Sequence, residues 1–297
     1  FDQLKFVDEK GFSSLKIKAD SPERSFEGNF EIKVEKGKLK LINSVDLDEY
    51  VEGVIEAEGG NSNDLEFLKV QAVICRTYAL SHLNTHEGFD LCDQVHCQVY
   101  KGKVRFNKTI FQAVEETKGK IIVDNTNNPI NSAFHSNCGG QTNNSEDVWT
   151  ATLPYLKSIQ DTFCCTMPHA MWIQKITASE WKKYLISEDN NKVLVSDTSK
   201  DAFSLLGSER NINYEYKGVK VPLKKIRNDW KFRSTFFNIV QEGDTLTFYG
   251  KGFGHGVGMC QEGAMQMAGK GYSYKDIINY YYKDVNIADI SVIDNFR

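Results

Sequence analysis

The chain has 297 residues, of which 40% are hydrophobic and 26% are charged, and its formal net charge is −4. This balance is typical of a globular protein, long enough for one large domain or two ordinary ones. A weakly acidic chain without a long basic run lacks a surface suited to nucleic-acid phosphates, so we exclude nucleic acid as a partner.

No segment approaches the roughly 18 to 20 uninterrupted apolar residues of a membrane-spanning helix. The chain begins with Phe1 rather than Met. We therefore expect a processed chain from which a signal peptide or lipoprotein anchor has been removed.

The first 45 residues are predicted to form β-strands. Apolar and polar residues alternate from Ser13 to Ile42, and Lys36-Gly37 between two such runs suits a hairpin turn. From Asp46 the apolar residues recur with helical spacing, which predicts a helix that ends near Glu58.

Asn63, followed three residues later by Glu66, predicts the start of a second helix, which runs to about Leu83 and is apolar nearly all round. Residues 90–103 look irregular. The other predicted elements are a helix over 109–117, strands over 120–124 and 130–135, a polar loop over 136–146, a strand over 245–249, a glycine-rich loop over 250–258, and helices over 261–268 and 274–282.

Residues of about 165–245 have a mixed pattern, with a helix near 179–185 and a strand near 236–240. They are predicted to form an inserted subdomain. The whole pattern indicates an α+β fold in one large domain over residues 1–297, with a β segment at residues 1–45 and helices mixed with antiparallel strands.

Glu58 is the carboxylate that the first helix places on its apolar face. At 100° per residue it falls within the apolar stripe, whereas the other glutamates of this helix point away from it: Glu49, Glu52 and Glu56. Burial disfavours the charged carboxylate and raises its pKa, which suits a general acid near neutral pH. The alternative is a structural glutamate that is satisfied by backbone donors or by Arg76.

The seven cysteines include no Cys-x-x-Cys pair. Cys92, His96 and Cys97 lie within six residues and could supply zinc ligands, with His135 or Cys138 completing a tetrahedral site. A disulfide between Cys92 and Cys97 is the alternative in an oxidising compartment. The sequence offers no interpretation of the adjacent pair Cys164-Cys165.

Several blocks resemble the SpoIID/LytB (stage II sporulation protein D) family, in which the first helix ends in a pattern like YVxGVVxxEMP and the next resembles LEALKAQAVAARTYAL. The corresponding blocks here are YVEGVIEAEGG, LEFLKVQAVICRTYAL, VHCQVYKG, SAFHSNCGGQTNNSEDVW, PYLKSIQD and GFGHGVGMCQEGAMQMAGKGYSYKDIINYYY. They follow the order of the family and cover about Asp46 to Val285. The sequence departs from the family at Gly59-Gly60, where Met-Pro is usual, and at Cys138 and Cys260, where Ser is common.

The resemblance implies a lytic transglycosylase, which cleaves the β-1,4 bond between N-acetylmuramic acid and N-acetylglucosamine and leaves a 1,6-anhydro-muramic acid end. Such a reaction needs one carboxylate, which the resemblance places at Glu58, and no cofactor. The implied partners are peptidoglycan glycan strands, with or without their peptide stems, and a cell-wall amidase or another envelope protein. The implied location is the cell envelope, in the periplasm or outside the cell; a role in sporulation or in general wall remodelling is left open.

The resemblance also places substrate contacts in a long cleft, formed by the Glu58 helix, the loop over 135–149 and the segment over 250–258. The implied contacts are Arg76, His135, Ser136, Thr142, Glu146, Lys157, His255 and Gln261. Trp149 would be an aromatic wall for a sugar ring or a core side chain. His255 would orient Glu58 or the substrate, or be structural. A hydrolytic mechanism requires Glu146 or Asp147 about 5 to 9 Å from Glu58.

Two other functions remain open. One is a peptidoglycan-binding module that enhances an amidase without cleaving glycan. The other is a zinc-dependent cell-wall hydrolase, which the absence of an HExxH motif disfavours.

Overall fold

The computed structural model describes residues 3–6, 14–18, 23–59, 62–105, 107–189 and 203–293. These residues form helices and mainly antiparallel sheets, which confirms the α+β class. The chain divides into two compact units. Unit 1 comprises Phe1–Ser132, Tyr272–Asp276 and Val285–Arg297, and unit 2 comprises Ala133–Gly271 and Ile277–Asp284.

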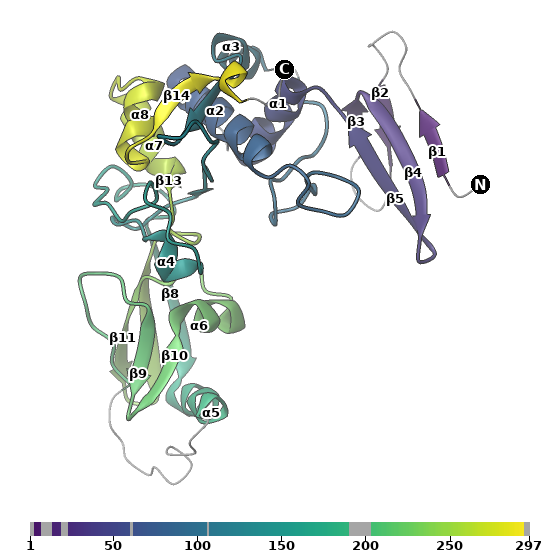
Figure 1. Cartoon of the computed structure of the whole chain (residues 1–297). Helices are drawn as coiled ribbons and strands as arrows, with labels where there is room; N and C mark the ends of the chain where they lie inside the picture. The colour runs from purple at the N-terminus through teal and green to yellow at the C-terminus, as the bar shows by residue number, and fades with distance from the viewer. Residues whose placement is uncertain are drawn as a thin grey trace. The chain divides into compact units, whose positions relative to one another are not determined.

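Unit 1 begins with short antiparallel strands (Figure 1). One sheet has the order β1-β4-β5 and a second pairs β2 with β3, the strands being β1 (Gln3–Phe6), β2 (Ser14–Ile17), β3 (Arg24–Glu27), β4 (Asn29–Glu35) and β5 (Lys38–Ser44). The predicted hairpin is present: Lys36 and Gly37 join β4 to β5 with φ angles of 51° and 74°. Both angles are left-handed, as a tight hairpin turn requires. Ser13, the first residue of the predicted alternating pattern, lies outside the described residues.

The helical part of unit 1 contains α1 (Leu47–Glu58), α2 (Leu65–Ser81) and α3 (Lys108–Glu116), together with the antiparallel pair β6 (Lys120–Val123) and β14 (Asn286–Asp289) and the short 3₁₀ helix Ile290–Val292. Helix α2 is buried on most of its circumference, as its sequence predicts. Its predicted start is wrong by one position, because Asp64 rather than Asn63 caps it by accepting the Phe67 N–H at 3.1 Å.

Arg76 connects the helices of unit 1. The side chain is 1% exposed, and its Nε and Nη2 donate to Oδ1 of Asp48 on α1 at 3.0 and 2.7 Å. Its Nη1 donates to the carbonyls of Thr117 and Lys120 at 2.9 and 3.1 Å. One buried cation thus joins α2 to α1, to the end of α3 and to the start of β6.

Unit 2 contains an antiparallel sheet with the order β11-β12-β8, a hairpin of β9 and β10, and the helices α5 and α6 (Figure 1). The bounds are β8 (Met171–Thr177), α5 (Ala178–Glu188), β9 (Asn213–Tyr216), β10 (Val219–Pro222), α6 (Leu223–Trp230), β11 (Phe237–Glu242) and β12 (Thr245–Lys251). An aromatic-rich core fills this part, with Trp181 and Phe248 fully buried at its centre. Residues 165–245, predicted to be an inserted subdomain, supply most of these elements and pair through β8 and β11 with β12.

The remaining elements of unit 2 are short: β7 (Phe134–His135) pairs in parallel with β13 (Met259–Cys260), and α4 (Ser145–Val148) precedes Trp149. Helix α7 (Gln261–Gly269) follows β13, and α8 (Tyr274–Tyr281) begins in unit 1 and ends in unit 2. The strand predicted over 130–135 is therefore much shorter than expected. Residues 90–103 contain neither helix nor strand, as predicted.

The glycine-rich segment after β12 lies against β7 and the loop that follows it. Gly252, Gly254, Gly256 and Gly258 all have positive φ, between 70° and 113°. A Cβ on Gly258 would lie 2.0 Å from the Ala133 carbonyl oxygen. The glycines are needed both for backbone conformation and for close approach.

In the described parts of the chain, no helix has the length and apolar character needed to cross a membrane.

We expect Arg76→Met to reduce the free energy of unfolding by about 3 kcal/mol, because it leaves Asp48 and two carbonyl groups without their donors. Arg24→Met is the control, since Arg24 makes a partly exposed ion pair with Asp93 at 3.8 Å. The control substitution should reduce the free energy of unfolding by less than about 1 kcal/mol. Urea denaturation measures both, and equal losses would contradict a bracing role for Arg76.

Candidate functional site

Glu58 is the last residue of α1 and is half-buried. Its Oε1 accepts a hydrogen bond of 2.6 Å from the Val99 backbone N–H. Burial raises the pKa of Glu58, whereas the Val99 hydrogen bond and the nearby charge of Lys101 lower it. Burial therefore favours the protonated carboxyl group, and the Val99 N–H stabilises its carboxylate form.

The segment that carries Val99 is fixed along α1. Tyr50 of α1 donates from its hydroxyl to Oε1 of Gln98 at 3.1 Å. A Cβ on Gly53 would lie 2.4 Å from the Gly102 carbonyl oxygen, so only glycine allows this approach. The position of the Val99 amide thus depends on contacts along the whole helix.

Arg76 does not pair with Glu58. Its donors go to Asp48 and to backbone carbonyls, as described above. Of the two structural partners considered for Glu58, the backbone donor is the one observed. Arg76 was expected to contact substrate, but its burial and internal bonds give it a bracing role.

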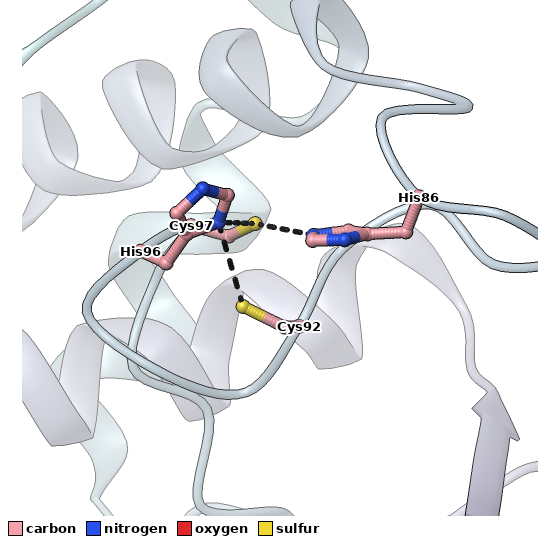
Figure 2. A group of neighbouring side chains, drawn as sticks. All are labelled: His86, Cys92, His96 and Cys97. Carbon is pink, nitrogen blue, oxygen red and sulfur yellow. Dashed lines mark hydrogen bonds between the residues drawn. The ribbon is translucent and has the colours of Figure 1, made fainter.

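Cys92, His96 and Cys97 come together, and His86 joins them (Figure 2). Their ligand atoms all lie within 4.8 Å of one another. Nε2 of His86 is 3.2 Å from Sγ of Cys97, and Nδ1 of His96 is 3.5 Å from the same sulfur and 3.9 Å from Sγ of Cys92. Both cysteines are free thiols. The sequence offers His135 or Cys138 as the fourth member, whereas the residue that the structure groups with the other three is His86.

Two thiols and two imidazoles are a donor set that suits tetrahedral zinc. The ring of His86 is fixed by stacking on Phe89, with 4.5 Å between ring centroids and 4° between ring planes. Four protein donors would complete the coordination of zinc, as in structural rather than catalytic sites. A sequence signal for His86 existed, since a histidine six residues before Cys92 extends the Cys/His cluster.

The cluster adjoins Glu58. Cys97 is two residues from Val99, whose amide contacts the carboxylate. Tyr78 of α2 lies within electrostatic reach of both: burial, then Cys97, Cys92 and Glu58, raise the pKa of Tyr78 to about 12. Any group that fixes the cluster would also fix the Glu58 contact.

The other residues expected at the site belong to unit 2. His255 is held by backbone on both sides: its Nε2 donates to the Phe134 carbonyl at 2.9 Å, and its Nδ1 accepts the Val257 N–H at 3.1 Å. Burial lowers the pKa of His255 to about 4. These contacts favour the structural interpretation of His255.

His135 is also neutral and buried. Its Nδ1 lies 3.1 Å from the Val257 carbonyl oxygen, and its Nε2 has no hydrogen-bond partner within the described parts of the chain. Burial, and then the neighbouring His255 and Arg210, lower its pKa well below the ordinary value.

Thr142 and Glu146 have internal partners. Oγ1 of Thr142 accepts the Ile159 N–H at 2.9 Å, and the residue is 1% exposed. Glu146 pairs with Lys157 at 2.5 Å, and this hydrogen bond lowers the pKa of Glu146. Gln261 is the first residue of α7 and is 9% exposed.

A polar group that sequence reasoning missed surrounds Ser136. Glu262 is buried, and its two oxygens lie 2.6 Å from Nδ1 of His169 and 2.6 Å from Nδ2 of Asn137. Oγ of Ser136 lies 3.3 Å from the same His169 nitrogen. A nucleophilic triad places serine and carboxylate on opposite ring nitrogens, so this arrangement does not activate Ser136 as a nucleophile.

Unit 2 contains a pocket bordered by Trp149 and His255. Burial lowers the pKa of Arg227 at this pocket, and its Nε has no partner among the described residues. An aromatic side chain beside amides and a cation is suited to a polar sugar. The lining residues are Asn143, Asp147, Val148, Trp149, Asn211, Ile212, Leu223, Lys224, Arg227, Asn228, Thr235 and His255.

The fold and site define an α+β protein with a half-buried glutamate at a helix end beside a Cys/His cluster. The family model described as "SpoIID: Stage II sporulation protein" matches residues 35–123, which contain both features. The chain is 31% identical over 272 residues to stage II sporulation protein D of Bacillus subtilis (strain 168), covering 86% of this chain and 78% of that protein.

Stage II sporulation protein D of Bacillus amyloliquefaciens is 32% identical over 272 residues, covering 86% of this chain and 77% of that protein. An amidase enhancer of Bacillus subtilis (strain 168) is 29% identical over 285 residues, covering 78% of this chain and 39% of that protein. The chain belongs to the stage II sporulation protein D family.

Glu52, six residues before Glu58, should make the stability of the protein depend on pH. Burial first, and then repulsion from Glu49, Asp48 and other carboxylates, raise its pKa from 4.5 to about 7. Between these values the native state binds more protons than the unfolded state, so stability falls as pH rises from about 4.5 to about 7. Glu52→Gln should therefore stabilise the protein more at pH 8 than at pH 5.

Urea denaturation midpoints of wild type and Glu52→Gln at both pH values measure this difference. Glu115→Gln is the control, because Glu115 is an exposed helical glutamate of the same unit with 78% of its side chain accessible. A gain from Glu52→Gln that is the same at both pH values would contradict the raised pKa.

Proposed function

We propose that this protein is a lytic transglycosylase that cleaves the bond between N-acetylmuramic acid and N-acetylglucosamine in peptidoglycan glycan strands. The observation that carries the proposal is the Glu58 carboxyl, half-buried at the end of α1 with one oxygen on the Val99 amide. Its raised pKa suits a general acid, and the amide suits the carboxylate that follows proton transfer.

In the proposed reaction, Glu58 protonates the glycosidic oxygen as the bond to the anomeric carbon breaks. The 6-hydroxyl of the same muramic acid attacks that carbon, and the Glu58 carboxylate accepts the hydroxyl proton. The glutamate is regenerated, the product ends in 1,6-anhydro-muramic acid, and no water is consumed. Holding the nucleophile within the substrate gives it a high effective concentration.

Two features favour one working carboxylate. Glu52 has a raised pKa, but six residues at 100° place it about 120° from Glu58 around α1. Glu146 has a lowered pKa and an ion pair with Lys157, both of which weaken it as the base or nucleophile that hydrolysis would require. These features favour the transglycosylase reaction over hydrolysis with a second carboxylate.

The proposed activity also implies a cellular location and binding partners for the protein. A protein that acts on peptidoglycan would work outside the cytoplasm, in the envelope, on strands that carry or lack peptide stems. The name of the amidase enhancer relative supports an amidase as a further partner. The pocket beside Trp149 and Arg227 is a suitable contact for a sugar unit.

We also propose a structural zinc ion at His86, Cys92, His96 and Cys97. Zinc there would fix the segment that leads through Cys97 to Val99, and so would hold the amide that contacts Glu58. Zinc would cross-link the segments that carry its four ligands, and it would take no part in the cleavage of the glycosidic bond. Because four protein ligands leave no coordination position for water, the cluster disfavours a zinc-dependent hydrolase.

A second candidate function is a glycan-binding enhancer of an amidase, which the similarity to the amidase enhancer favours. This function would require binding to glycan but not the acid of Glu58. The two candidates therefore differ in their dependence on that one carboxyl group.

Glu58→Gln should abolish glycan cleavage while leaving the denaturation midpoint nearly unchanged, because the amide can still accept from Val99 but cannot donate an acid proton. The measurement is mass spectrometry of products from peptidoglycan with and without peptide stems. Glu52→Gln is the matched control, a half-buried glutamate of the same helix, and should retain activity and 1,6-anhydro products.

Reducing ends in the products would instead indicate hydrolysis and a second carboxylate. Glycan binding without cleavage by the wild type, unaffected by Glu58→Gln, would favour the enhancer.

Cys97→Ser should lose one equivalent of bound zinc and lower the rate of cleavage, because the Val99 segment loses its anchor. Zinc content is measured by mass spectrometry of the metal in protein purified without chelator. Cys165→Ser, at an exposed cysteine outside the cluster, is the control and should keep the wild-type content. Unchanged zinc in Cys97→Ser would refute the proposed site.

A further inference from the structure

A second group of metal-ligating side chains lies in unit 2, apart from any residue used in the proposed reaction. Cys138, Asp161, Cys164 and Cys260 place their ligand atoms within 4.8 Å of one another, and all four are buried. They come from separate segments: the loop after β7, residues 161–164, and the end of β13. Three separated segments thus bring three thiols and a carboxylate to one point in the interior.

The distances at this point approach those of a coordination shell. Sγ of Cys138 is 3.3 Å from Sγ of Cys164 and 3.3 Å from Oδ2 of Asp161. Around tetrahedral zinc, with Zn–S bonds of about 2.3 Å, two sulfurs lie roughly 3.8 Å apart. A shift of about half an ångström at Cys138 would open the group enough for the ion.

Backbone N–H groups and a tyrosine hydroxyl donate hydrogen bonds to side chains of this group. Metal-bound ligands typically accept hydrogen bonds of this kind. Sγ of Cys260 accepts the backbone N–H groups of Cys138 and Gly263 at 3.3 and 3.4 Å. Asp161 accepts the Tyr281 hydroxyl on Oδ2 and the Phe163 N–H on Oδ1, both at 2.9 Å. Such donors orient metal ligands and favour their charged forms.

Gly263 shows how closely this surrounding shell is packed. A Cβ at that position would lie 2.2 Å from the Tyr281 hydroxyl and 2.5 Å from Oδ2 of Asp161. The start of α7 can therefore approach the carboxylate only because the residue is glycine.

A buried cation accompanies the group. Arg210 donates to the carbonyl oxygens of Cys138 and Gln141 at 2.6 and 2.7 Å and lies within electrostatic reach of the three cysteines. Its Nη1 is buried and has no partner among the described residues. Three thiolates and one carboxylate around a divalent ion would carry a net charge of −2, which a buried guanidinium would partly offset.

We propose that Cys138, Asp161, Cys164 and Cys260 form a second, fully buried site for a thiophilic divalent metal ion, with zinc as the expected ion. Binding would release the thiol protons to solvent and form three metal–sulfur bonds and one metal–oxygen bond. With four protein ligands and no exposure, the site would be structural. It would join the loop after β7, residues 161–164 and the start of α7.

Metal content decides the proposal and separates it from the zinc ion proposed at His86. The full chain should bind two equivalents of zinc, and the double variant Cys92→Ser, Cys97→Ser should keep one. Adding Cys164→Ser to that double variant should remove the remaining equivalent, whereas adding Cys165→Ser, at the exposed neighbouring cysteine, should not. Cobalt(II) in the double variant should give the thiolate charge-transfer bands of a tetrahedral three-sulfur site.

A double variant that binds no zinc or cobalt would overturn the proposal, as would a Cys138–Cys164 disulfide in a non-reducing peptide map of the wild type. Retention of the metal after Cys164→Ser would also overturn it. If a variant does not fold, cobalt titration of the wild type decides: two equivalents support the second site. A single equivalent that is lost in Cys97→Ser refutes it without affecting the site at His86.

Discussion

The hydrogen bond from the Val99 amide to Glu58 is the contact on which the candidate site depends. Burial at the end of α1 favours the protonated acid, and the amide favours the carboxylate. A group that must donate and then accept a proton benefits from interactions that stabilise each of its two forms. The balance requires Val99 to stay in place, which in turn requires Gly53 at the contact with Gly102 and a fixed segment beyond Cys97.

The carboxylates of α1 illustrate how position, and not residue type, determines chemistry. Asp48 forms an ion pair with the buried Arg76 and serves the packing of three elements. Glu52 lies among other carboxylates and has a pKa raised to about 7, yet it has no role in the proposed reaction. Glu58 combines partial burial with a hydrogen bond from the Val99 backbone N–H. A raised pKa alone therefore does not identify the acid, and the surrounding contacts must be considered as well.

In unit 2, residues that look catalytic in the sequence mainly support the backbone. His255 uses both ring nitrogens on backbone groups, and Thr142 accepts from Ile159. The glycines over 252–258 are required by positive φ and by close contacts with β7 and its loop. This dense polar interior leaves the pocket beside Trp149 as the feature best suited to a ligand.

The sequence by itself determined the α+β class, the helices α1 and α2, the β4–β5 hairpin and the apolar face on which Glu58 lies, because periodicity and turn residues act over short stretches of chain. It also indicated the Cys/His cluster, since three of its members lie within six residues. Only the tertiary structure decided that His86 completes this cluster, that Val99 and not Arg76 contacts Glu58, and that Cys138, Asp161, Cys164 and Cys260 meet. Each of these contacts joins residues whose spacing follows no helical or strand period. They depend on how the elements pack, which no local pattern encodes.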